Sequence, residues 1–282
     1  MPDSSRIGMR AEELEVSLRR VSLDRYPELH AYTRDEIYGH GDQLSPGALY
    51  LCARMARSLQ VHPGDVVLDV GCGLGESSIF LARHYGVKVI AVDLGTPERT
   101  LSKKFSERGY RDTIIPMNLD ITNPLPFAKG YFDAVFCMTS IHYFGLTPEF
   151  LKHLVRYLKR GGRFSVGNTC FDREIPPDRV PDIYRTTPPG AIMDGWSNEC
   201  SRYHSPEWWR RLFEQSGLVK VIECVELEDG PAMWEDKLAY DLEKSDWTEE
   251  KVESMKWKID QILHRGDDTP RFTFFVAAVE KR

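Results

Sequence analysis

The sequence lacks three features that would point to common kinds of binding site. No apolar run approaches the roughly 20 residues that a membrane-spanning helix needs, so we expect no membrane association. Lys and Arg are spread along the 282 residues and the formal net charge is −6, which disfavours a nucleic-acid partner. No Cys-x-x-Cys pair occurs, which disfavours a zinc knuckle or a dithiol redox site, and we expect no metal.

Unpaired cysteines and a polar N-terminal stretch bear on the compartment. The six cysteines lie far apart in the chain: Cys52, Cys72, Cys137, Cys170, Cys200 and Cys224. Free cysteines are typical of a reducing environment, and the polar first residues do not resemble a secretion signal, so we expect a cytoplasmic protein. With 41% hydrophobic residues, the chain is long enough for one substantial α/β core that carries insertions.

The most informative stretch is an apolar run that stops at closely spaced glycines. Residues 66–70 read as a buried strand, Gly71, Gly73 and Gly75 as a tight turn, and the residues after them as a helix. A dinucleotide fingerprint has its third glycine three residues after the second, whereas Gly73 and Gly75 are only two apart. The spacing therefore argues against NAD.

Two acids indicate which ligand the turn would hold. Asp69 precedes the first glycine, where a carboxylate disfavours a pyrophosphate and favours a cation. Asp93 ends the next apolar run, where a carboxylate can accept hydrogen bonds from both ribose hydroxyls. An adenosine that also carries an ammonium and a sulfonium fits both acids, so the predicted cofactor is S-adenosyl-L-methionine.

Three further segments extend the glycine turn into a family pattern. Residues 118–121, 131–136 and 158–164 follow in order and resemble the segment after the third strand, the fourth strand, and the helix, glycine turn and fifth strand of class I S-adenosylmethionine-dependent methyltransferases. The resemblance covers roughly residues 61–169 and implies that Asp120 contacts the adenine amino group. The candidate cofactor residues are Ser45, Asp69, Gly71, Cys72, Gly73, Asp93, Leu94, Asn118, Asp120, Ile121 and Cys137.

The same pattern predicts the fold. Strand-like runs near 66–70, 87–92, 113–117, 132–137 and 163–168 alternate with helical ones, which is typical of a parallel sheet with helices on both faces. A helix should begin near Ser45, and strands should follow at 219–227 and 271–279. The resemblance implies a Rossmann-like α/β fold with a seven-stranded, mostly parallel sheet whose last strand is antiparallel.

Material outside this core should cover the site. We predict an N-terminal segment and lid at 1–44 and a methyltransferase domain at 45–282, with insertions at 170–204 and 231–268. The first insertion is too rich in proline for a regular helix or central strand, and the second is charged and helix-prone. Trp196 and Trp234 are candidate walls of an acceptor pocket, the alternative being that they bury the insertions on the core.

The segment 38–47 is the best clue to the acceptor. It resembles the segment before the core of phosphoethanolamine methyltransferases and, more loosely, those of sarcosine/dimethylglycine and tocopherol methyltransferases, which implies a cofactor contact for Ser45. His40 stands where the first family has an acid, and that family's catalytic tyrosine has no match, so a phosphoethanolamine substrate is not supported. An ordinary lid with a Ser-Pro helix start is the alternative.

Three residues are candidate catalytic groups: His142, His40 and Tyr38. His142 follows the fourth strand, where many of the resembling enzymes place a histidine that faces the acceptor. An imidazole there could remove or orient the proton of an amine, hydroxyl or thiol, and the alternative is a structural histidine beneath the loop.

The predicted function is methyl transfer from S-adenosylmethionine to a small-molecule acceptor, with nitrogen favoured over oxygen, sulfur or carbon, by a monomer or homodimer. Methylation of a metalloid is less favoured because the cysteine spacing does not match that of arsenite enzymes. A non-catalytic S-adenosylmethionine sensor or an activating subunit is the alternative from a different class.

Overall fold

A seven-stranded sheet forms the centre of the computed structural model, which describes residues 18–39, 45–187, 193–244 and 269–282. The strand order is β3-β2-β1-β4-β5-β7-β6; neighbours from β3 to β5 pair in parallel, and β7 is antiparallel to both β5 and β6. The strands are β1 (Val66–Val70), β2 (Lys88–Asp93), β3 (Ile114–Asn118), β4 (Phe132–Met138), β5 (Leu158–Phe171), β6 (Val219–Glu226) and β7 (Phe272–Lys281). The predicted α/β fold with an antiparallel last strand is confirmed.

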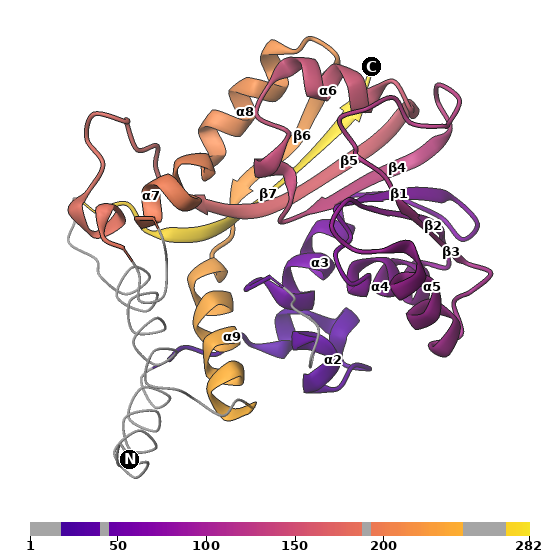
Figure 1. Ribbon diagram of the computed structural model, residues 1–282, viewed down its shortest axis with the longest axis horizontal. Coiled ribbons are helices and arrows are strands. Elements are labelled where there is room, and N and C mark those ends of the chain that lie inside the picture. Colours follow the sequence, from indigo (N-terminus) through magenta and orange to yellow (C-terminus); the bar gives the residue numbers. More distant parts are fainter. Residues whose placement is uncertain (1–17, 40–44, 188–192, 245–268) are drawn as a thin grey trace.

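Helices cover both faces of the sheet (Figure 1). Alternate strand residues point to opposite faces, so each face carries apolar side chains that the helices bury. On one face lie α3 (Ala48–Ala56), α4 (Glu76–Tyr85) and α5 (Glu98–Glu107), and on the other lie α6 (Pro148–Val155) and α8 (Pro206–Gln215). Val67 and Val89 join the first core, whereas Leu68 and Ile90 join the second. Because the central strands are almost continuously apolar, they bury apolar side chains on both faces of the sheet.

Local signals explain where several helices begin. The hydroxyls of Thr147 and Ser205 accept hydrogen bonds from backbone N–H groups in the first turns of α6 and α8, and a proline follows each of these caps. Helix α4 begins after Gly75 and ends at Gly86, both of which adopt left-handed backbone angles.

The fifth strand is longer than the sequence indicates. The family resemblance assigned residues 158–162 to a helix end and a glycine turn, but the structure has them in β5. Leu158 pairs with Phe132, and the register then shifts before Ala134 pairs with Arg163. A side chain at Gly162 would lie 2.6 Å from the carbonyl oxygen of Asp133, so the glycine permits a close backbone approach inside the sheet. The fold thus uses these glycines in an irregular strand and not in a turn.

Both predicted insertions and the N-terminal segment meet at one end of the sheet (Figure 1). The described part of the first insertion contains the short helical elements η4 (Asp182–Arg185), α7 (Gly195–Asn198) and η5 (Cys200–Arg202), and that of the second contains α9 (Gly230–Lys244). A separate apolar core joins them: Leu18, Phe171, Ile175, Val180, Tyr184, Cys200, Leu238, Ala239 and Phe272. Strand β5 continues to Phe171, so the first inserted segment leaves the sheet after that residue.

Buried charges attach the N-terminal segment to α9. The Glu235 side chain is fully buried, and its carboxylate accepts hydrogen bonds from the backbone N–H of Arg19 at 2.8 Å and from the Arg19 guanidinium. Beside it, Asp236 accepts a bond of 3.0 Å from the backbone N–H of Val21. The segment continues through η1 (Leu23–Arg25) and η2 (Pro27–Leu29) to α2 (Arg34–Tyr38), where Tyr240 of α9 stacks on Tyr38 at 4.6 Å. These contacts unite two segments that lie about 200 positions apart.

We predict that Glu235→Ala lowers the free energy of unfolding by about 2 to 3 kcal/mol, because it leaves the Arg19 groups without their buried partner. The matched control is Glu107→Ala on α5, whose ion pair with Lys103 is largely exposed and should cost about 0.5 kcal/mol or less. Urea unfolding at pH 7 measures both, and equal losses would contradict a structural role for the Glu235 contact.

Candidate active site

The glycine turn is held by backbone hydrogen bonds and leaves an open surface above it. The N–H groups of Gly71 and Cys72 both donate to Val92 O, which ties the turn to the end of β2. Gly73 has φ +54°, and a side chain there would meet nothing within 4 Å. Gly75, at φ +84°, packs so closely on Phe105 that a side chain would lie 2.5 Å from its ring. The turn therefore presents bare backbone, where a ligand can approach.

Asp69 is a buried carboxylate with one unpartnered oxygen. It is 1% exposed, and its Oδ2 accepts hydrogen bonds from Ser77 Oγ at 2.7 Å and Ser78 Oγ at 2.6 Å. Its Oδ1 is buried without a partner in the described structure. Burial raises the pKa of Asp69 to about 6, although the two serines act in the opposite direction. A cation beside Oδ1 would remove this penalty.

Asp93 organises the loop after β2. Its Oδ2 accepts from the backbone N–H of Gly73 at 2.9 Å, and its Oδ1 accepts from those of Gly95 and Thr96. A carboxylate has about four acceptor positions, so one on Oδ2 stays open for the predicted ribose contact. The Asn118 side-chain amide donates to three carbonyls of the same loop, including those of Asp93 and Thr96. Leu94, at 66% exposure, presents a large apolar surface at this edge.

The other predicted cofactor residues differ in how accessible their polar atoms are. Asp120 accepts from Thr122 and Asn123 within its own turn, and the Thr122 hydroxyl lowers the pKa of Asp120. Cys137 is fully buried, with Sγ 3.1 Å from Ser140 Oγ. Ile121 and Cys72 are buried apolar neighbours of the turns. The Ser45 hydroxyl is buried without a partner in the described structure, so it remains available to a ligand.

The loop after β4 is fixed against the glycine turn. Ser140 Oγ donates to Val70 O at 2.9 Å. A side chain at Gly71 would lie 2.3 Å from Ser140 Oγ. Thr139 adopts φ +52°, a left-handed angle that is unfavourable for a β-branched residue. Strain of this kind persists only where surrounding contacts enforce it. The contacts of Ser140 with Val70 and Gly71 hold the start of η3 (Ile141–Tyr143) beside the glycine turn.

His142, within η3, is 3% exposed and oriented by β5. Its Nδ1 lies 2.9 Å from Asn168 Oδ1, and the Asn168 amide nitrogen donates to Thr169 O, so the amide oxygen faces the imidazole. Nδ1 therefore carries the proton and donates it. Nε2 is buried and has no hydrogen-bond partner in the described structure. In the neutral imidazole the lone pair of this nitrogen is therefore free.

A carboxylate from the first insertion lies next to that nitrogen. Glu199 Oε1 is 3.4 Å from His142 Nε2, a charge contact whose geometry does not make a hydrogen bond. The Tyr143 hydroxyl donates to the same oxygen at 2.9 Å. The His142 imidazole in its protonated form, together with the hydroxyls of Tyr203 and Tyr143, lowers the pKa of Glu199 to about 2, against the effect of burial. Glu199 is therefore charged at neutral pH.

The other described candidates, Tyr38, Trp196 and Trp234, have contacts of their own. Tyr38 is 2% exposed, and burial together with the neighbouring Asp236 raises its pKa well above the ordinary value. His40 lies outside the described residues. Trp196 stacks on Phe171, and Trp234 stacks on Phe272 and Phe274, so both rings pack on the sheet. The catalytic roles predicted for Tyr38 and His40 stay predictions.

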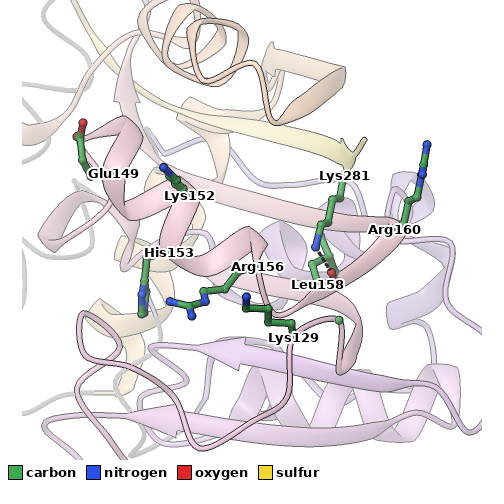
Figure 2. Close-up of a pocket in the computed structure, with 9 residues that line it drawn as sticks. Lys129, Glu149, Lys152, His153, Arg156, Leu158, Arg160 and Lys281 are labelled. Atoms are coloured by element: carbon green, nitrogen blue, oxygen red, sulfur yellow. Dashed lines mark hydrogen bonds between the residues drawn. The ribbon is translucent and has the colours of Figure 1, made fainter.

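A pocket of about 720 Å³, lined mainly by Lys and Arg side chains, lies at the edge of the sheet where β4 and β5 begin (Figure 2). Lys129 precedes β4, Leu158 begins β5, and Lys281 ends the antiparallel β7, where its Nζ donates to Leu158 O at 2.6 Å. The glycine turn and His142 instead follow the carboxyl ends of β1 and β4. The pocket thus takes no part in the candidate site.

The described ranges lack a candidate metal site and a candidate membrane-spanning helix. They contain no group of three or more His, Cys, Asp or Glu side chains arranged to hold a metal ion. No helix in them has the length and apolar character needed to cross a membrane. All six cysteines are buried free thiols.

Sequence reasoning missed Asn168, Glu199 and the serine pair Ser77 and Ser78. Asn168 had a detectable signal, since an amide inside an apolar central strand needs a specific partner. Glu199 had none, because its contact joins positions 57 residues apart and depends on how the insertion folds.

The sequence of the chain is similar to those of known methyltransferases. The family model described as "Methyltransferase domain" matches residues 67–162. The 2-methyl-6-phytyl-1,4-hydroquinone methyltransferase of Synechocystis sp. is 31% identical over 160 residues, covering 56% of this chain and 48% of that protein. The 27-O-demethylrifamycin SV methyltransferase of Amycolatopsis mediterranei is 27% identical over 224 residues, covering 71% and 80%. The chain thus spans about half the length of the first of these relatives.

A solved structure gives the same fold. Phosphoethanolamine N-methyltransferase 2 of Haemonchus contortus, solved with S-adenosyl-L-methionine, superposes with a TM-score of 0.65 at 16% identity, covering 93% of this chain and 60% of that one. Its similarity supports the fold, and the sequence matches support the domain type. The chain thus contains a methyltransferase domain of the Rossmann-like α/β fold, similar to methyltransferases that act on small molecules.

Proposed function

We propose that the protein transfers the methyl group of S-adenosylmethionine to a small-molecule acceptor, and that the acceptor atom is an amine nitrogen. The observation that carries this proposal is the buried, unpartnered Nε2 of His142 beside the glycine turn. No protein donor occupies such a nitrogen, so in the neutral imidazole it can accept a proton from a bound acceptor.

The residues of the turn fit the cofactor. The bare surface at Gly73 leaves room for the cofactor to approach the backbone, and the free oxygen of Asp69 is suited to its ammonium group. The open acceptor position of Asp93 suits a ribose hydroxyl, and the exposed side chain of Leu94 suits one face of an adenine. The unpartnered Ser45 hydroxyl adds a polar contact from the start of α3.

When bound, S-adenosylmethionine supplies an electrophilic methyl group on a positively charged sulfur. The protein needs no nucleophile of its own for this chemistry, and its part is to hold both reactants in line and to exclude water. His142 Nε2 takes the proton of the acceptor nitrogen, because an amine attacks only with a free lone pair. The resulting imidazolium keeps its Nδ1–H bond to Asn168.

The surroundings of His142 support an amine over an alcohol or a carbon acceptor. Glu199 is negatively charged, and the aromatic rings of Tyr143 and Tyr203 flank the imidazole with centroids 3.9 and 5.2 Å from it. Carboxylates and aromatic faces both attract a protonated amine. The resemblance of segment 38–47 to the phosphoethanolamine and sarcosine enzymes points the same way.

Incubation with methyl-labelled S-adenosylmethionine and separate pools of small amines, phenols and thiols tests the proposal. Label should appear in the amine pool. Tight cofactor binding without label in any pool would contradict methyl transfer and favour the sensor. Label only in the phenol or thiol pool would contradict the nitrogen assignment alone.

With the acceptor identified in that assay, His142→Gln should lower kcat about 100-fold or more, since it removes the base. The dissociation constant of the cofactor, measured by calorimetry, should change less than twofold. The matched control is His204→Gln, which alters a histidine that pairs with Glu174 in the same insertion. A full rate in His142→Gln would contradict the base role.

Asp69→Asn should make the free protein more stable at pH 7 and weaken cofactor binding at least tenfold. The folded state retains the Asp69 proton up to about pH 6, whereas the unfolded chain releases it near 3.8. Stability therefore falls as pH rises between these values, by about 3 kcal/mol at most, and stays low above pH 6.

The asparagine variant lacks that loss, so the two proteins should differ by about 1 to 3 kcal/mol at pH 7 and by less at pH 4. Urea unfolding and calorimetry measure the two effects. Unchanged cofactor affinity would contradict the ammonium contact, and a less stable variant at pH 7 would contradict the burial cost.

A further inference from the structure

The histidine at the active-site edge has a charged partner that belongs to neither cofactor motif. Glu199 lies between α7 and η5 of the first insertion and reaches the η3 imidazole across 57 positions of sequence. Its side chain is 38% exposed, whereas that of His142 is 4% exposed. The carboxylate therefore covers a buried nitrogen from the solvent side.

The contact is arranged so that charge acts on Nε2 without occupying its lone pair. At 3.4 Å the carboxylate is close enough for a strong electrostatic effect in a partly buried site. Nε2 nevertheless has no hydrogen-bond partner, so its lone pair stays free to take a proton. Once protonated, the imidazole gains a neighbouring negative charge.

Glu199 is itself held in place. Tyr143 OH donates to its Oε1 at 2.9 Å, and Tyr203 contributes to keeping the carboxylate ionised. Tyr203 packs edge-on against the imidazole, and the Arg202 guanidinium lies 5.9 Å from the Tyr143 ring centroid. Asn168 faces the other side of the imidazole through Nδ1. Among the charged groups that the structure describes, Glu199 is the one within 4 Å of the His142 imidazole nitrogens.

We propose that Glu199 is the positioning residue of His142: it fixes the imidazole from the inserted segment and stabilises its protonated form, so that the insertion completes the base. Asn168 selects which nitrogen works, and Glu199 places a negative charge beside that nitrogen. The inference rests on the proposed function for the statement that His142 is a base, but the pairing itself does not.

The pairing is tested without any acceptor by histidine NMR of the whole chain. The signal of His142 is identified among the eight histidines by its absence in His142→Gln. A negative charge favours the protonated imidazole, so its removal in Glu199→Gln should move the His142 titration midpoint down by about one pH unit, a tenfold loss of proton affinity.

Two variants serve as controls. Glu174→Gln makes the same substitution in the other histidine–glutamate pair of the insertion, where His204 Nδ1 lies 2.7 Å from Glu174, and should leave the His142 midpoint unchanged. Glu199→Asp keeps the charge and should restore at least half of the lost midpoint. It also keeps the inference testable if Glu199→Gln does not fold.

Kinetics with the identified acceptor give a second readout. Glu199→Gln should lower kcat about tenfold with little change in KM for the cofactor, and the acid limb of the pH profile should move down with the NMR midpoint. In the His142→Gln background the same change should cost less than twofold, because Glu199 acts through the histidine.

The outcomes separate the inference from the proposed function. An unchanged midpoint in Glu199→Gln overturns the inference even if His142→Gln is inactive. A lowered midpoint together with a fully active His142→Gln overturns the base role and leaves the pairing standing. A loss of activity in Glu199→Gln that is equally large in the His142→Gln background would also overturn the inference, since a merely structural role gives that result.

Discussion

The Ser140 hydroxyl, which fills the space where a side chain of residue 71 would lie, is the constraint on which the active-site edge depends. Ser140 donates to the carbonyl of Val70, and its position leaves no room for any side chain at residue 71. The loop after β4 is thereby joined to the loop after β1, and Thr139 accepts an unfavourable backbone angle to reach that place. Because His142 follows two residues later, the cofactor turn and the imidazole are parts of one rigid edge.

Two carboxylates at this edge, Asp69 and Glu199, differ in pKa because their partners differ. Asp69 has only hydroxyl donors and one free oxygen, so burial dominates and its pKa rises to about 6. Glu199 has an imidazole and two phenolic donors, so its pKa falls to about 2. On the side of the glycine turn a ligand can supply the cation that Asp69 lacks, whereas Glu199 has the His142 imidazole beside it within the protein.

The sequence predicted the sheet and the cofactor turn because both depend on local patterns. Alternating apolar runs determined the strands, and the glycine spacing with Asp69 and Asp93 determined the kind of ligand. The pattern misread residues 158–162, since glycines that permit a close approach inside a strand look the same as glycines in a turn. It could not find Glu199, whose neighbours are set by a separate small core and not by its own flanking residues.

The glycine turn and the surroundings of His142 also differ in which parts of the chain build them. The turn at Gly71 is made by residues adjacent in sequence and stabilised by backbone hydrogen bonds to β2, so its geometry follows from the sheet. The surroundings of His142 need the N-terminal segment, the first insertion and α9 to fold together, through the Arg19 contact with Glu235 and the shared apolar core. Loss of order in any of these segments would disturb Glu199 and its tyrosines while the glycine turn remained intact. Acceptor binding should therefore respond to changes far from the site that leave the cofactor turn unaffected.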